Sequence, residues 1–128
     1  MTGPLHYGVI GTGMMGVEHI RDIQALDGAE VTALCDPDEG SLSAARGVAG
    51  DGPACFNDHR DLLADDRCDA IVVATPNMTH CDILLDVISA GIPVLVEKPL
   101  CLEFLLKLLK GLFLASQVYV FSLPHLTG

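Results

Sequence analysis

Short, largely apolar runs alternate with segments of helical periodicity through the first 97 residues of the chain. Each run predicts a strand buried on both faces, because its apolar residues are not confined to alternate positions. The runs are Leu5–Ile10, Val31–Cys35, Ala70–Ala74 and Val94–Val96, with a shorter candidate at Ala54–Phe56. Helices are predicted over Met14–Leu26, Glu39–Val48, Asp58–Ala64 and Thr79–Gly91, with Thr79 as the N-cap of the last. This alternation predicts an α/β fold with a doubly wound parallel sheet and right-handed crossovers.

A glycine-rich turn joins the first predicted strand to the first predicted helix. The segment Gly11-Thr12-Gly13-Met14-Met15-Gly16 has the spacing G-x-G-x-x-G. In this context the first glycine allows a tight turn, the second lets a pyrophosphate approach the backbone, and the third lets the helix pack closely on the sheet. The N–H groups at the positive end of the helix would face the phosphates. We therefore expect all six residues to contact a dinucleotide; the alternative is a plain strand-to-helix turn.

A carboxylate follows the second predicted strand. Asp36 lies 20 residues after Gly16, the separation at which an acid accepts hydrogen bonds from the ribose hydroxyls of a bound adenosine. Residues 37–39 are Pro, Asp and Glu, with no Arg or Lys, so a 2′-phosphate would meet only negative charge. The pattern predicts NAD as cofactor, with NADP disfavoured. The alternative is that Asp36 caps the helix that follows.

Two further polar segments follow predicted strands, at the ends where open α/β sheets bind ligands. They are residues 75–80 (TPNMTH) and residues 97–99 (EKP). Together with GVIGTGMMG and ALCDPD, they resemble the N-terminal Rossmann-like domain of the glucose–fructose oxidoreductase / inositol dehydrogenase / MocA (Gfo/Idh/MocA) family over about residues 5–101. The resemblance implies an NAD(P)-dependent oxidoreductase that acts on a hydroxyl or carbonyl group of sugars, cyclitols or related diols.

The resemblance also implies roles for individual residues. Gly11, Gly13 and Gly16 would hold the pyrophosphate, and Asp36 the adenosine ribose. The wall near the cofactor would be lined by Thr75, Pro76, Asn77 and His80, and Glu97 would contact the ribose on the nicotinamide side. Lys98 would approach the substrate hydroxyl as the catalytic residue, because a cation there stabilises the alkoxide that develops as hydride leaves carbon. Without the resemblance, Glu97 and Lys98 would be read as solvated charges at a strand end, and His80 as a surface residue.

The family pattern stops after Leu100-Cys101, so we expect a Rossmann-like domain over residues 1–101 and an atypical apolar tail over residues 102–128. In the tail we expect a crossover helix over 102–110 and a last strand over Val118–Ser122. A membrane-seeking segment and an amphipathic surface helix are the alternatives, but the uncharged stretch 112–127 is shorter than a spanning helix. The family's C-terminal α/β substrate domain would be missing, which suggests a truncated product without catalysis of its own. A non-catalytic nucleotide-binding or interaction fragment is the alternative function.

The net charge and the cysteines limit which classes of partner and which cellular compartment are expected. The chain carries 17 acidic residues against 7 Lys plus Arg, a net charge of -10, which disfavours nucleic acids and anionic membranes. The five cysteines include no C-x-x-C pair, so we expect free thiols in the cytoplasm and no metal site. No secretory signal is visible at the N-terminus. The expected partners are a nicotinamide dinucleotide and a polyol or sugar-like substrate, with self-association through exposed apolar surface.

Overall fold

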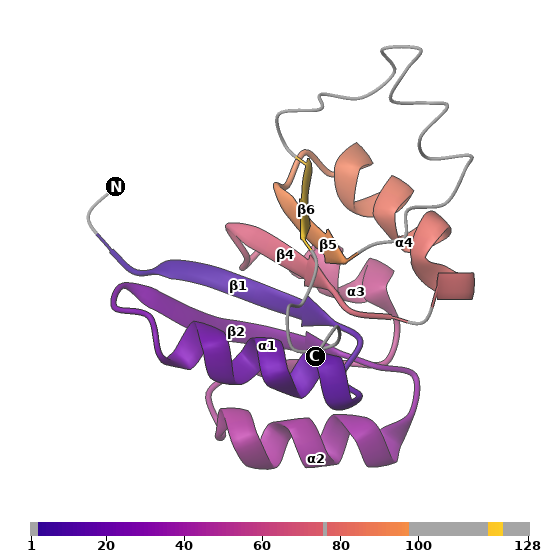
Figure 1. Cartoon of the computed structure of the whole chain (residues 1–128). Coiled ribbons are helices and arrows are strands. Elements are labelled where there is room, and N and C mark those ends of the chain that lie inside the picture. Colours follow the sequence, from indigo (N-terminus) through magenta and orange to yellow (C-terminus); the bar gives the residue numbers. More distant parts are fainter. Residues whose placement is uncertain (1–2, 76, 98–117, 122–128) are drawn as a thin grey trace.

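The computed structural model describes residues 3–75, 77–97 and 118–121 (Figure 1). The elements of this part of the chain are β1 (Leu5–Ile10), α1 (Met14–Gln24), β2 (Ala29–Cys35), α2 (Glu39–Ala49), β3 (Ala54–Phe56), α3 (His59–Asp65), β4 (Ala70–Val73), α4 (Asn77–Ser89), β5 (Val94–Glu97) and β6 (Val118–Phe121). The strands and helices expected before residue 98 are all present. Residues 102–110, where a crossover helix was expected, lie outside the described residues.

The six strands form one parallel sheet in the order β3-β2-β1-β4-β5-β6. The chain winds outward from β1 to β3, returns to the centre at β4, and then winds outward in the opposite direction. This confirms the doubly wound parallel sheet, and β6 confirms the last strand expected in the tail. The strand order reverses between β1 and β4, which is the point at which open α/β sheets bind ligands. The domain boundary at residue 101 stays a prediction.

Helices cover both faces of the sheet, as strands with two apolar faces require. Helices α1 and α2 pack on one face, and α3 and α4 pack on the other (Figure 1). Full burial of one large aliphatic side chain stabilises a fold by about 1.5–3 kcal/mol, so these two layers supply most of the driving force for folding. The fully buried side chains include Ile10, Ile20, Leu34, Ile71 and Leu84.

One row of side chains crosses the sheet on the α1 face, with its members paired in register from β2 through β6. The row is Leu34, Val9, Val72, Leu95 and Tyr119. Exposure rises along it, from 0% at Leu34 and Val9 and 2% at Val72 to 54% at Tyr119. Helix α1 therefore covers this face of the sheet less completely toward β6. A groove of about 220 Å³ opens between α1 and the sheet there, lined in part by Ile23, Val72 and Leu95.

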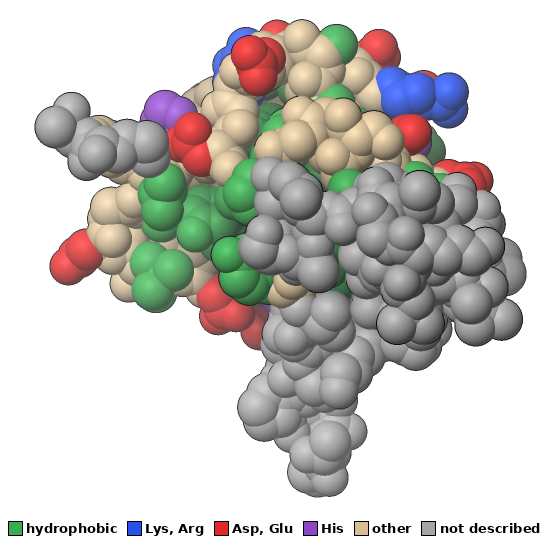
Figure 2. Space-filling view, turned by 90° about the horizontal axis from the view of Figure 1, so that it is seen from above, with side chains coloured by type: hydrophobic (Ala, Val, Ile, Leu, Met, Phe, Trp, Pro, Cys, Tyr) green, Lys and Arg blue, Asp and Glu red, His purple; other side chains and the backbone are tan. Residues whose placement is uncertain are grey.

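Side chains on the surface reflect the acidic composition. On the face shown in Figure 2, hydrophobic side chains gather into a patch, and carboxylates lie around its border. Among the described residues, no helix is both long enough and apolar enough to cross a lipid bilayer.

Two expectations about local structure were wrong. Helix α4 begins at Asn77, so Thr79 lies inside its first turn and is not its N-cap. Proline is compatible with the first turn of a helix, and the sequence Thr-Pro-Asn therefore permits a start this early.

Cys35, Cys55 and Cys68 are free thiols as expected, but Cys81 is disulfide-bonded. A single bridge requires only two cysteines that are close in space, which their spacing along the chain does not reveal. The cytoplasmic location stays a prediction.

Candidate functional site

The glycine turn lies at the centre of the sheet edge, between the carboxyl ends of β1, β2 and β4. Gly11 has a φ of +96°, and a Cβ on it would lie 2.7 Å from the carbonyl carbon of Ala74 and from the nitrogen of Thr75. Its N–H donates to the carbonyl oxygen of Cys35 at 2.8 Å. Both the backbone conformation and the close approach of β4 thus require glycine here.

The other two glycines have different surroundings. A Cβ on Gly16 would lie 1.9 Å from the carbonyl oxygen of Gly11. The same Cβ would lie 3.7 Å from Cγ1 of Val9 in β1, so α1 packs closely on the sheet here, as expected, and the backbone of the turn is what requires glycine. No described atom lies within 4 Å of the position that a Cβ would take on Gly13, which leaves open space for a ligand. Met14 is 84% exposed, and Met15 is half-buried.

The positive end of α1 is left without a side-chain cap by the described residues. Gly13 is its N-cap, and the first turn of α1 contains no acidic residue. In contrast, Asp38 caps α2 by accepting from Ser41 N at 2.8 Å, and Asp58 caps α3 by accepting from Arg60 N at 2.8 Å. The uncapped end of α1 can therefore receive an external anion through its N–H groups.

Asp36 lies beside the glycine turn, as the sequence predicted. Its Oδ2 accepts from Thr12 N at 2.8 Å and from Thr12 Oγ1 at 3.0 Å, while its Oδ1 accepts from Asp38 N at 2.8 Å. Its own N–H donates to the carbonyl oxygen of Phe56 at 3.1 Å. Since Asp38 is the N-cap of α2, the alternative that Asp36 caps this helix is wrong.

The other expected site residues lie at the carboxyl ends of β4 and β5. Thr75 follows β4; the residue is half-buried, and its buried Oγ1 has no hydrogen-bond partner among the described residues. Asn77 and His80 belong to the first turns of α4, and Glu97 is the last residue of β5. The described residues therefore bring five predicted positions of the backbone to the edge that holds the glycine turn: 36, 75, 77, 80 and 97. Pro76 and Lys98 lie outside the described residues, as do the side chains of Asn77, His80 and Glu97.

Comparison with known proteins identifies the family. Residues 5–109 match the Gfo/Idh/MocA family, described as an oxidoreductase family with an NAD-binding Rossmann fold. The chain belongs to this family. The match extends eight residues beyond residue 101, where we expected the resemblance to end. The described part of the chain is thus an NAD-binding Rossmann domain of this family.

Curated Gfo/Idh/MocA relatives include inositol dehydrogenases. The chain is 44% identical over 94 residues to inositol 2-dehydrogenase 1 of Saccharopolyspora erythraea, a match that covers 73% of the chain and 28% of the relative. It is 41% identical over 100 residues to inositol 2-dehydrogenase of Leifsonia xyli, covering 77% of the chain and 29% of the relative. The chain therefore spans less than a third of the length of these relatives.

Solved structures of similar fold hold both a nicotinamide cofactor and a sugar-like compound. Myo-inositol dehydrogenase from Lactobacillus casei, in complex with NAD(H) and myo-inositol, has a TM-score of 0.84 at 30% identity, with 91% of this chain and 36% of that chain covered. The WlbA dehydrogenase from Bordetella pertussis, in complex with NADH and UDP-GlcNAcA, has a TM-score of 0.80 at 30% identity, with 94% and 36% covered.

One residue at the Gfo/Idh/MocA site was missed by sequence reasoning. Asn57 Nδ2 donates to the carbonyl oxygen of Asp36 at 3.2 Å and to Glu39 Oε1 at 2.8 Å. It thereby ties the end of β3 to the segment that carries the carboxylate. Its position directly after the short β3 was the available signal, because the carboxyl ends of parallel strands share one edge.

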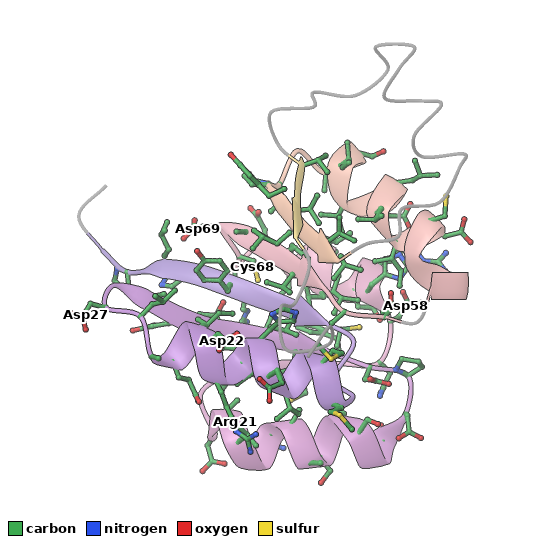
Figure 3. All side chains as sticks on the ribbon, viewed as in Figure 1. Arg21, Asp22, Asp27, Asp58, Cys68 and Asp69 are labelled. Atoms are coloured by element: carbon green, nitrogen blue, oxygen red, sulfur yellow. The ribbon has the colours of Figure 1, made fainter. Side chains whose placement is uncertain are left out.

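Other titratable groups outside the predicted site lie at both ends of the strands. His6 N donates to Asp69 Oδ2 at 2.9 Å, at the amino ends of the strands; Figure 3 shows Asp27 and Asp69 there, with Asp58 at the opposite end. His59 Nε2 and Asp86 Oδ2 lie 2.6 Å apart and link α3 to α4. Burial raises the pKa of the Cys35 thiol to about 12, and the nearby carboxylates, Asp36 first among them, add to the rise. This thiol is therefore a buried core group and not a nucleophile.

Proposed function

We propose that the glycine turn and Asp36 bind the ADP half of NAD, and that the chain is the cofactor-binding part of an oxidoreductase acting on a ring CH–OH group. The observation that carries the proposal is the contact between the two motifs. The Asp36 carboxylate accepts from Thr12 at 2.8 and 3.0 Å, which places the ribose acceptor directly beside the phosphate-binding turn. In the cofactor the adenosine ribose is bonded directly to the pyrophosphate, so neighbouring sites are needed to hold both.

The chain's own residues fit the cofactor. The uncapped N-terminus of α1 supplies N–H groups for the pyrophosphate, and the open space at Gly13 gives the phosphates access to the backbone. The buried Oγ1 of Thr75 is a polar group at the adjoining strand end that lacks a partner among the described residues, and a bound ligand would satisfy it.

The charges around Asp36 favour NAD over NADP. A 2′-phosphate on the adenosine ribose would lie beside the Asp36 carboxylate, with Asp38 and Glu39 as the next charged residues and no cation among residues 36–39. Repulsion between the phosphate and these carboxylates would weaken NADP binding, whereas the free 2′-hydroxyl of NAD can donate to Asp36.

The relatives support a substrate class for the complete protein. The curated relatives compared above are named inositol dehydrogenases, and the two similar structures are complexes of NAD(H) with myo-inositol and of NADH with UDP-GlcNAcA. NAD, when bound, accepts the hydride from the carbon that bears the hydroxyl. In the proposed site Thr75, Pro76, Asn77, His80 and Glu97 line the cofactor, and Lys98 takes part in moving the hydroxyl proton. Cyclitols or related sugars are the proposed substrates of the complete protein.

Fluorescence titration of the purified 128-residue chain with NADH and NADPH tests the cofactor proposal. NADH should bind more tightly than NADPH. Asp36→Asn keeps the shape of the side chain but removes its charge, and should weaken NADH binding about tenfold, the loss expected for a hydrogen bond to a charged group. Asp51→Asn, at an exposed loop acid, is the matched control. Equal or tighter binding of NADPH to the unaltered chain would contradict the proposal.

A further inference from the structure

We infer that Thr12 is a positioning residue for cofactor selectivity: its hydroxyl fixes the Asp36 carboxylate relative to the glycine turn. Sequence reasoning placed Thr12 among the residues that contact the cofactor. In the structure Thr12 is 1% exposed, and its Oγ1 donates to Asp36 Oδ2 at 3.0 Å. The side chain is thus occupied by Asp36 and acts on the cofactor through it. The inference rests on the proposed function and deepens it.

The pattern of donors decides which oxygen of Asp36 is left for a ribose. Thr12 supplies two donors to Oδ2, its N–H at 2.8 Å and its hydroxyl at 3.0 Å. Oδ1 receives one donor, the N–H of Asp38 at 2.8 Å. A carboxylate offers about four acceptor positions, two on each oxygen. Oδ2 is therefore filled, and one position remains on Oδ1 to accept a ribose hydroxyl.

The hydroxyl of Thr12 also restrains the rotation of the carboxylate. The two backbone N–H groups, from Thr12 and Asp38, hold one oxygen each and would tolerate a tilt of the carboxylate plane. The third donor, Thr12 Oγ1, lies on a side chain and fixes the plane from a second direction. Without it, Asp36 could turn away from a 2′-phosphate, and the repulsion that disfavours NADPH would weaken.

The positioning role and a purely structural role predict different results. Thr12→Val keeps the branched shape in this buried position and removes only the hydroxyl. If the hydroxyl serves stability alone, the variant unfolds more easily and the ratio of NADH to NADPH affinity stays the same. If it positions Asp36, NADH affinity falls about fivefold while NADPH affinity changes much less, so the ratio falls by a similar factor.

The experiment titrates NADH and NADPH against the unaltered chain, Thr12→Val and Thr12→Ser, and measures urea unfolding of each by circular dichroism. Thr32→Val is the matched control, since the Thr32 hydroxyl donates to the carbonyl oxygen of Arg67 at 3.4 Å, away from the glycine turn. We expect the affinity ratio to fall in Thr12→Val, to be restored in Thr12→Ser and to be unchanged in Thr32→Val. In an Asp36→Asn background, Thr12→Val should leave the ratio unaltered.

A Thr12→Val chain that binds NADH with the unaltered ratio would overturn the inference while leaving the proposed function in place. An unaltered chain that binds neither nucleotide would overturn both. If circular dichroism shows that Thr12→Val is unfolded, Thr12→Ala removes the same hydroxyl with less volume and serves in the same comparison.

Discussion

Replacing Gly16 by alanine tests the placement of α1 on the glycine turn. The new Cβ would lie 1.9 Å from the carbonyl oxygen of Gly11, whereas ordinary contacts begin at 3.4 Å. The first turn of α1 must therefore move away by about 1.5 Å, the difference between these two distances. The obstacle is backbone and cannot rotate aside, so relief requires displacement of either the helix or the turn.

Two opposing effects, a gain in helix propensity and a steric clash, determine how much Gly16→Ala changes the free energy of unfolding. Alanine in place of glycine inside a helix stabilises it by about 0.8–1.0 kcal/mol. Inserting a carbon into a filled space costs about 1–3 kcal/mol, and a fixed carbonyl oxygen as neighbour places this substitution at or above the upper end. The net expectation for Gly16→Ala is a loss of about 2 kcal/mol in the free energy of unfolding. NADH affinity should also fall, because the N–H groups of the first turn move with the helix.

Urea unfolding followed by circular dichroism measures the change, and Gly47→Ala is its control. Gly47 lies exposed in α2, with no described atom within 4 Å of its hypothetical Cβ. There the helical preference acts alone, and the variant should gain about 0.5–1 kcal/mol. The reasoning is refuted if Gly16→Ala is as stable as the unaltered chain, because the carbonyl of Gly11 would then not lie where the structure places it.

Three further predictions concern groups outside the turn. The hydrogen bond from Ser41 N lowers the pKa of Asp38 below its usual 3.8, so the charged carboxylate stabilises the fold above pH 3.8 and loses this effect as the pH falls through the lowered pKa. Asp38→Ala should therefore lower the free energy of unfolding at neutral pH. Urea titrations should show that the variant and the unaltered chain differ less in acid. Burial raises the pKa of Cys35 to about 12, so mass spectrometry after brief iodoacetamide treatment should find this thiol unmodified in the folded chain and alkylated in urea. Asp86→Asn should weaken the 2.6 Å contact with His59 and lower the unfolding free energy by about 1 kcal/mol, with unchanged stability as the contrary result.

The arrangement of strands and helices could be predicted because it depends on local patterns. A parallel strand buried on both faces is apolar throughout, and β1 and β3 begin and end at the residues that the apolar runs indicated. The glycine spacing and the acid after β2 also carry their meaning within short stretches of sequence. The start of α4 was misplaced because Thr79 has the chemistry of an N-cap, while Thr75-Pro76-Asn77 permits an earlier start.

Contacts across the sheet edge could not be predicted, because they depend on which chain ends meet in space. The sequence placed Thr12 and Asp36 at the same ligand but did not reveal that they hydrogen-bond to each other. The position of Asn57 directly after β3 placed it at this edge, but the sequence did not reveal that its amide binds the backbone of Asp36. Such polar contacts between distant segments require the register of the strands, which the pattern of apolar residues does not contain.

The rising exposure from Val9 to Tyr119 means that resistance to local opening is unequal across the domain. Among the described strands, β6 pairs with one neighbour and lies at one border of the sheet, with β3 at the other, so its amide hydrogens should exchange with solvent earlier than those of β1, which has a partner on each side. On this side of the sheet, fraying will begin at β6 and proceed inward. The glycine turn follows β1, which β4 and β5 separate from β6, so the part of the molecule proposed to bind the adenosine can stay ordered after β6 has detached.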